Sequence, residues 1–130
     1  MKRRDTARTD ASDAAIEAML PLSPAWLHVL LAVAGGHKHG YAIRREVEAR
    51  TRNRVKLWPA TLYGTLSQLS SAALLEEVEG EAADAEGGDA RRRCYRLTQW
   101  GRTVLDAETR RLEELVRYAH SRGAVSEPGV

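Results

Sequence analysis

Prolines and glycines at the ends of apolar runs constrain this 130-residue chain most, because they fix where its helices begin and end. Pro24 and Pro59 stand where a first helical turn tolerates a residue without an N–H, and Ser23 can cap the first of these helices. Gly35 and Gly36 follow that helix and stop it. The expected helices span residues 13–20, 24–34, 41–51, 59 onward and 98–119.

A β-hairpin is expected between the last two helices. Residues 75–78 read as a short strand, and residues 92–97 alternate, with Arg93 and Tyr95 on one side. The connecting residues contain three glycines and favour turns. The order predicts a mainly α fold: a winged helix-turn-helix with a two-stranded β-hairpin wing and a long C-terminal dimerisation helix.

Charge is strongly segregated although the formal net charge is only +2. Residues 37–58 hold seven Lys or Arg and two Glu, and residues 91–102 hold five Arg and no acid. Between them, residues 76–90 hold seven acids and no base. A nearly neutral protein can therefore still present a basic face to a polyanion.

The expected helix that begins at Pro59 has no charged side chain, and small and polar residues lie beside its leucine stripe (Leu62, Leu66, Leu69, Ala73). Small residues let a helix approach the floor of a DNA major groove, and hydroxyl and amide groups can contact base edges and phosphates. An ordinary polar helix face is the alternative, but the basic neighbours favour DNA. The candidate DNA-binding residues are Arg44, Arg45, Ala60, Thr61, Tyr63, Gly64, Thr65, Ser67, Gln68, Arg91, Arg92 and Arg93.

The arginines of the wing follow a Gly-Gly loop, where they can track a phosphate backbone and reach the minor groove. A solvated charge run is the simpler alternative. The preceding acids either screen these arginines or lie on the far side of the hairpin, and the pattern leaves both arrangements open.

Apolar stripes on the helix at residues 24–34 and on the last helix predict a homodimer, since a chain of this size buries only a modest core alone. The helix at residues 24–34 is apolar on two sides, and the last helix carries a short heptad-like seam broken by Glu108. The candidate dimerisation residues are Trp26, Val29, Val33, Leu105, Leu112 and Leu115.

Four segments are expected. They are a partly disordered N-terminal extension (1–22), the winged helix-turn-helix DNA-binding domain (23–97), the C-terminal dimerisation helix (98–119) and a disordered tail (120–130). The short helix in the N-terminal extension is either a frayed tail or a docking helix for a partner subunit.

Several classes of function find no support in the sequence. The single cysteine, Cys94, excludes an internal disulfide, and four scattered histidines do not form a zinc motif. No apolar run reaches the roughly 20 residues of a membrane span, and no secretory signal is present. No catalytic motif is found. We therefore expect a cytoplasmic non-enzyme with no cofactor or metal, and leave a small-molecule effector open.

The sequence resembles the PadR family of bacterial transcriptional regulators, in its short-tailed subgroup with a single C-terminal helix. The resemblance covers residues 25–118 and rests on pieces that occur in family order. These pieces are His39-Gly40-Tyr41, Thr61-Leu62-Tyr63 with Leu66 and Leu69, Leu74-Leu75, Arg92-Arg93, Tyr95-Arg96-Leu97-Thr98 and Gly101.

The resemblance implies a homodimeric repressor whose recognition helices enter successive major grooves of a palindrome. It also implies that Thr61 and Tyr63 contact the DNA backbone and that residues 87–92 form the wing tip. The chain departs from the family pattern at several positions, namely Ala60 for Gly, Gly64 for Pro, Ser67-Gln68 for a basic pair, Ala73 for Gly, and Leu112 for the Trp that binds drugs in some relatives.

A protein-interaction module is the alternative function, in which the same fold docks its basic face on an acidic protein partner. A salt-dependent gel shift with the upstream DNA separates the two, because a docking module would not prefer that fragment.

Overall fold

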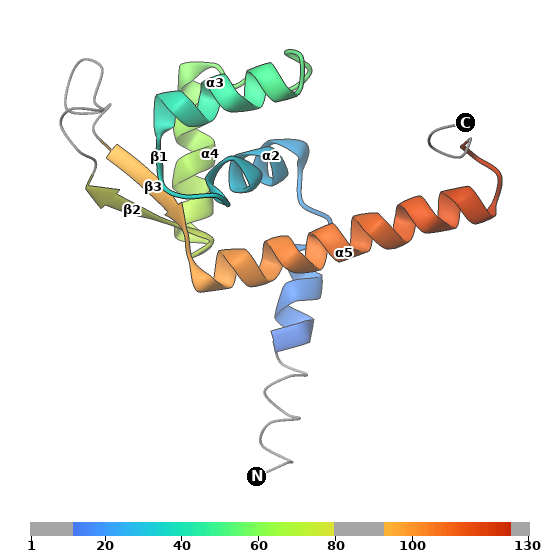
Figure 1. Ribbon diagram of the computed structural model, residues 1–130. Helices are drawn as coiled ribbons and strands as arrows, with labels where there is room; N and C mark the ends of the chain where they lie inside the picture. The colour runs from blue at the N-terminus through green and yellow to red at the C-terminus, as the bar shows by residue number, and fades with distance from the viewer. Residues whose placement is uncertain (1–11, 80–92, 126–130) are drawn as a thin grey trace, which may run out of the picture. The chain divides into compact units, whose positions relative to one another are not determined.

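The computed structural model describes residues 12–79 and 93–125 (Figure 1). The chain divides into two compact units, one formed by Leu22–Leu105 and the other by Met1–Pro21 with Asp106–Val130. The first unit holds the helix-turn-helix and a small sheet. It also includes the first turns of the last helix, which the sequence had placed in a separate segment.

The helices of the first unit are α2 (Pro24–Val33), α3 (Gly40–Arg50), α4 (Pro59–Ser71) and the beginning of α5 (Gln99–Ser121). Side-chain caps begin α2 and α5, whereas α3 and α4 start without one. The Ser23 hydroxyl accepts a hydrogen bond from the Trp26 backbone N–H at 3.2 Å, with Pro24 in the first turn. At α5, the Thr98 hydroxyl accepts from the Gly101 N–H at 2.8 Å. Local chemistry therefore sets these boundaries.

The sheet has three antiparallel strands, where the sequence predicted two. They are β1 (Lys38–His39), β2 (Leu75–Glu79) and β3 (Arg93–Leu97), in the spatial order β1-β3-β2. β1 was missed because two residues between a glycine pair and a helix start carry no alternating pattern. Its pairing with β3 ties the wing to the entrance of α3 (Figure 1).

The core of the first unit is built from leucine, valine and isoleucine side chains. On α4, Leu62, Leu66 and Leu69 are each at most 2% exposed, as the leucine stripe predicts. Ala73 was expected in the same stripe, and that expectation is wrong. It is exposed, follows the end of the helix and has a φ of 62°, a left-handed conformation that ends a helix.

Three of the residues expected at a dimer interface belong to the core instead. Val29 and Val33 are 0% and 1% exposed, and Leu105 is 7% exposed. A side chain already removed from water gains little further burial from a second subunit. The expectation that these three residues form an open docking surface is therefore wrong.

Gly101 allows α5 to lie against the chain that enters the sheet. A Cβ built on Gly101 would lie 2.1 Å from the Leu74 carbonyl oxygen and 2.9 Å from Leu97 Cδ1. No other amino acid fits without a shift of backbone. The sequence marked Gly101 as part of the family resemblance without a structural reason, and this close packing supplies one.

The second unit contains the helix Ser12–Met19 and the remainder of α5. Glu108, which interrupts the apolar seam, is 1% exposed and forms an ion pair with Arg111. Hydrogen bonding to Glu108 raises the pKa of Arg111, so this arginine stays charged.

Within the described residues, no single helix is both long and apolar enough to cross a membrane, although Ser12–Met19 and α2 pass that test as a bent pair, by length and composition alone.

Candidate nucleic-acid interface

The exposed face of α4 is uncharged and lined by small side chains. Ala60, Gly64 and Ser67 follow one another along it at helical spacing, and all three are exposed. A Cβ built on Gly64 meets no atom within 4 Å, so the helix backbone is open to a neighbouring molecule there. Such a face can approach a surface more closely than a helix with long side chains.

Polar residues flank this row, but Thr65 does not join them. Thr61 and Gln68 are exposed on one side of the row and Tyr63, 38% exposed, on the other. Thr65 is only 6% exposed. It lies three residues after Leu62 and four before Leu69, which turns it toward the core. The expectation that Thr65 offers its hydroxyl to DNA is therefore wrong.

Gln68 is held in place by a residue that the sequence assigned to a different surface. The Trp26 indole Nε1–H of α2 donates a hydrogen bond to Gln68 Oε1 at 3.2 Å. This bond fixes the side-chain amide and directs its NH₂ group away from Trp26. Trp26 thus supports a side chain of α4, whereas the sequence had placed it only on the expected dimer surface.

Tyr63 packs on the start of α3. A Cβ on Gly40 would lie 3.4 Å from Tyr63 Cε1 and 3.5 Å from Leu66 Cδ1, so the absence of a side chain there lets α3 and α4 pack closely. Nearby on β3, burial and then the Glu77 carboxylate raise the pKa of Tyr95, which stays neutral. The absence of a side chain at Gly40 therefore lets the Tyr63 ring lie beside the exposed row of α4.

The two arginines expected on α3 differ in their surroundings. Arg44 Nε donates to Glu48 Oε2 at 3.3 Å, and the same carboxylate oxygen accepts from the Leu57 N–H at 3.3 Å. The Glu48 carboxylate thus joins α3 to the entrance of α4 and offsets the charge of Arg44. Arg45 is exposed and lies over the Tyr41 ring, 5.8 Å from its centroid, which keeps its charge available.

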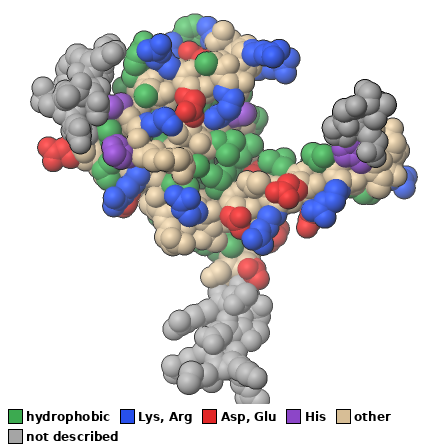
Figure 2. Space-filling model, viewed as in Figure 1, with side chains coloured by type: hydrophobic (Ala, Val, Ile, Leu, Met, Phe, Trp, Pro, Cys, Tyr) green, Lys and Arg blue, Asp and Glu red, His purple; other side chains and the backbone are tan. Residues whose placement is uncertain are grey.

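The segment between α3 and α4 adds further cations. Figure 2 shows Lys and Arg side chains over α3 and around its end, with acidic side chains between some of them. Lys56 lies over the Trp58 ring, 4.8 Å from its centroid, directly before α4. Trp58 is 58% exposed and makes no side-chain cap bond to the helix.

On the wing, acids and arginines pair across the two strands. Arg93 Nε lies 3.1 Å from Glu77 Oε1, and Arg96 forms a second ion pair with Glu76. The sequence left open whether the acids screen the arginines or lie on the far side of the hairpin. Among the described residues, Glu76 and Glu77 lie beside the arginines and screen them. Arg91, Arg92 and the expected wing tip lie outside the described residues.

Cys94 and His39 face each other across β1 and β3. Cys94 Sγ lies 3.4 Å from His39 Nδ1, and His39 Nε2 is a buried nitrogen without a hydrogen-bond partner among the described residues. Cys94 is 1% exposed and packs as a small core residue. Across residues 12–79 and 93–125, no group of His, Cys, Asp and Glu is arranged to hold a metal ion.

The distal part of α5 carries the largest exposed apolar side chains of its unit. Leu115, Val116 and Tyr118 are 52%, 54% and 61% exposed, and Leu112 is half-buried. A shallow groove of about 430 Å³ runs along this helix past Leu112 and Val116. Of the expected dimerisation residues, Leu112 and Leu115 are thus available for contact, and Val116 and Tyr118 join them.

A helix-turn-helix followed by an antiparallel wing and a long helix defines a winged helix-turn-helix protein. The model of the Transcriptional regulator PadR-like family matches residues 29–107. Transcriptional regulator Rv3488 of Mycobacterium tuberculosis is 36% identical over 91 residues, which cover 70% of this chain and 78% of that protein. The chain belongs to the PadR-like family of transcriptional regulators, which confirms the resemblance and the expectation of a non-enzyme.

Solved structures share the fold at lower sequence identity. A PadR family transcription regulator from Clostridium difficile has a TM-score of 0.56 and 19% identity, and the match covers 74% of this chain and 96% of that one. Bacillus subtilis PadR in complex with operator DNA has a TM-score of 0.55 and 17% identity, covering 67% and 46%. These matches confirm the winged helix fold.

Proposed function

We propose that this regulator is a DNA-binding repressor that acts as a homodimer on a palindromic operator. The observation that carries the proposal is the exposed face of α4, where an uncharged row of Ala60, Gly64 and Ser67 lies between polar flanks. The second helix of a helix-turn-helix enters the major groove, and small side chains permit the closest approach. A regulator of this kind works on DNA in the cytoplasm.

In this proposal the residues divide by task. Thr61 and Tyr63 contact the DNA backbone, and Gln68 reads a base edge with the NH₂ group that its bond to Trp26 leaves free. Arg45 contacts phosphate, and Arg93 does so once its link to Glu77 opens. Arg44 positions α4 through Glu48, so its part in DNA binding is indirect.

The structure of Bacillus subtilis PadR with operator DNA supports this reading, because its fold matches the present chain. The homodimer is supported by the exposed Leu115, Val116 and Tyr118 on α5. Two recognition helices reach grooves one DNA turn apart, ~34 Å, only if the subunits are held in a fixed relation.

The experiment is selection of DNA fragments by the full-length protein, followed by binding measurements over a range of salt concentrations. We expect a palindromic motif to be enriched and log affinity to fall linearly with log salt concentration. Arg45→Gln should lower the slope by about 0.9, as expected for one lost phosphate contact. Arg110→Gln, on α5, is the matched control and should leave the slope unchanged.

Selection of no motif would overturn the proposal, as would affinity that does not depend on salt. Preference for an acidic protein over every DNA fragment would instead indicate the docking module.

A further inference from the structure

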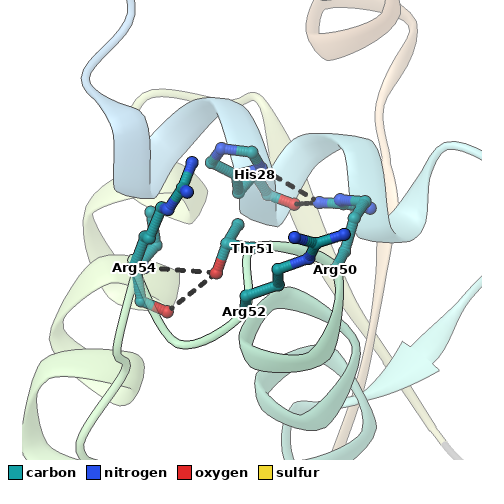
Figure 3. Close-up of a pocket in the computed structure, with 6 residues that line it drawn as sticks. His28, Arg50, Thr51, Arg52 and Arg54 are labelled. Atoms are coloured by element: carbon teal, nitrogen blue, oxygen red, sulfur yellow. Dashed lines mark hydrogen bonds between the residues drawn. The ribbon is translucent and has the colours of Figure 1, made fainter.

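A basic cleft lies between α2 and the turn that follows α3, and none of its lining residues belongs to α4. It has a volume of about 300 Å³ and is lined by His28, Arg50, Thr51, Arg52, Arg54 and Val55. In Figure 3, His28 lies on one wall and the three arginine side chains surround the opening. No carboxylate is among these lining residues, so the walls are either positive or neutral.

The turn that carries two of these arginines has a fixed backbone. Thr51 Oγ1 donates to the Val47 carbonyl at 2.8 Å and accepts from the Val55 N–H at 3.2 Å. Arg52 and Asn53 have φ values of 53° and 62°, in the left-handed region that arginine adopts rarely and asparagine more readily. The backbone that carries Arg52 and Arg54 is therefore held in a defined turn, with both side chains exposed beside the cleft.

Arg50 forms another wall and is already oriented. One of its terminal nitrogens lies 3.0 Å from the His28 carbonyl and 3.2 Å from His28 Nδ1. The other donates to Glu46 Oε2 at 3.2 Å, and Glu46 also pairs with Lys38 at 3.0 Å. The Glu46 carboxylate is thus shared between two cations.

Charge at the cleft is consequently unbalanced. Among the described residues, Arg52 and Arg54 take part in no ion pair, whereas Arg50 is balanced by Glu46. Burial and then the Arg50 guanidinium lower the pKa of His28, which therefore stays neutral at pH 7 and adds no charge. Two free arginines match the charge of a phosphate monoester, about −1.5 to −2 at neutral pH, and their planar forks suit the oxygens of any phosphate group.

We propose that the cleft formed by His28 and the turn of residues 50–55 binds a phosphate group. Arg52 and Arg54 hold it by paired N–H donors, and Arg50 and Thr51 complete the lining of the cleft. The group comes either from a small phosphorylated ligand or from the DNA backbone beside the operator. The site does not depend on the proposed operator binding, since free phosphate can be tested without DNA.

The test follows backbone amide shifts of residues 51–55 by NMR while inorganic phosphate replaces chloride at constant ionic strength. We expect a saturable shift with a dissociation constant on the order of 1 mM or lower. Arg52→Gln with Arg54→Gln should weaken binding about tenfold or more. Arg102→Gln removes an exposed arginine outside the cleft and should bind phosphate like the native chain.

Two outcomes would overturn the proposal: shifts that do not saturate, or a double variant that matches Arg102→Gln. Circular dichroism checks that the double variant folds, and Arg54→Gln alone, which leaves the left-handed residues intact, gives a second measurement.

The source of the phosphate is decided by adding a random-sequence duplex. If DNA supplies it, the duplex shifts the same amides, phosphate competes, and the double variant lowers the salt slope by about two. If a small ligand supplies it, DNA leaves these amides unshifted and phosphate still binds.

Discussion

Trp26 on α2 and Gln68 on α4 are joined by a hydrogen bond of 3.2 Å from the indole Nε1 to the side-chain amide oxygen. The two residues are 42 positions apart in the chain. The bond engages the oxygen of Gln68 and leaves its NH₂ group as a donor. If Gln68 reads a base as proposed, we expect its preferred partner to have an acceptor at the major-groove edge, as guanine does.

Replacing Gln68 should therefore flatten sequence preference more than it weakens binding to random DNA. We expect Gln68→Ala to cost ~1–3 kcal/mol at one operator position. Trp26→Phe should reduce the same preference by freeing the amide to rotate. Binding to single-base operator variants measures both effects. Trp100→Phe serves as the control, and an unchanged preference in Gln68→Ala would argue against this orientation of α4.

Two glycines should respond in opposite ways to the same added methyl group. Gly101→Ala places a Cβ against the Leu74 carbonyl, so we expect unfolding free energy to fall by about 2–4 kcal/mol. Gly64→Ala has open space and should stabilise the helix by ~0.5–1 kcal/mol. Urea unfolding measures both, and similar effects at the two sites would contradict the packing described.

Gly64→Ala also tests the proposed interface. If the row of small residues on α4 lies against the groove floor, the stabilised variant should bind its operator more weakly than the native chain. Equal or tighter binding would show that α4 does not approach DNA at Gly64.

The distal part of α5 should hold the dimer. Leu115→Asp replaces a side chain that is 52% exposed, so the subunit should remain folded while the dimer dissociates. Arg110→Asp introduces the same aspartate side chain on the opposite side of the helix and should not affect assembly. Analytical ultracentrifugation at micromolar concentration gives the oligomeric state of both variants. A dimeric Leu115→Asp protein would show that the dimer interface does not lie on this part of α5.

His28 should make the fold less stable in mild acid. Because its pKa is lowered in the folded protein, the unfolded chain binds protons more tightly. The contribution of neutral His28 to the free energy of unfolding is therefore fully present above pH 6.5. It is lost as the pH drops from 6.5 through the pKa of His28 in the folded protein. NMR titration should give a midpoint below 6.5 that rises in Arg50→Gln. A midpoint at or above 6.5 in the native protein would contradict the assignment.

Helix limits could be predicted from the sequence because their causes are local. Ser23, Pro24, Pro59 and Thr98 each act within a few residues of a helix start. Thr65 was misassigned although the signal was present, since its spacing from Leu62 and Leu69 places it on the buried face.

Other features depend on contacts between distant parts of the chain. The apolar sides of α2 could not reveal that Val29 and Val33 already lie in the core of their own chain. Nor does any local pattern mark the Trp26–Gln68 bond or the two residues of β1. The i, i+4 pair of Arg44 and Glu48, by contrast, was visible in the spacing.

The central position of β3 bears on how the domain folds. β3 pairs with β2, which precedes it, and with Lys38 and His39, more than fifty residues earlier in the chain. Because α3 and α4 lie between β1 and β3 in the sequence, the small sheet can be completed only after these two helices have folded back and brought the strands together. Such non-local pairing slows the search for the native state and joins the helices and the wing in one cooperative transition.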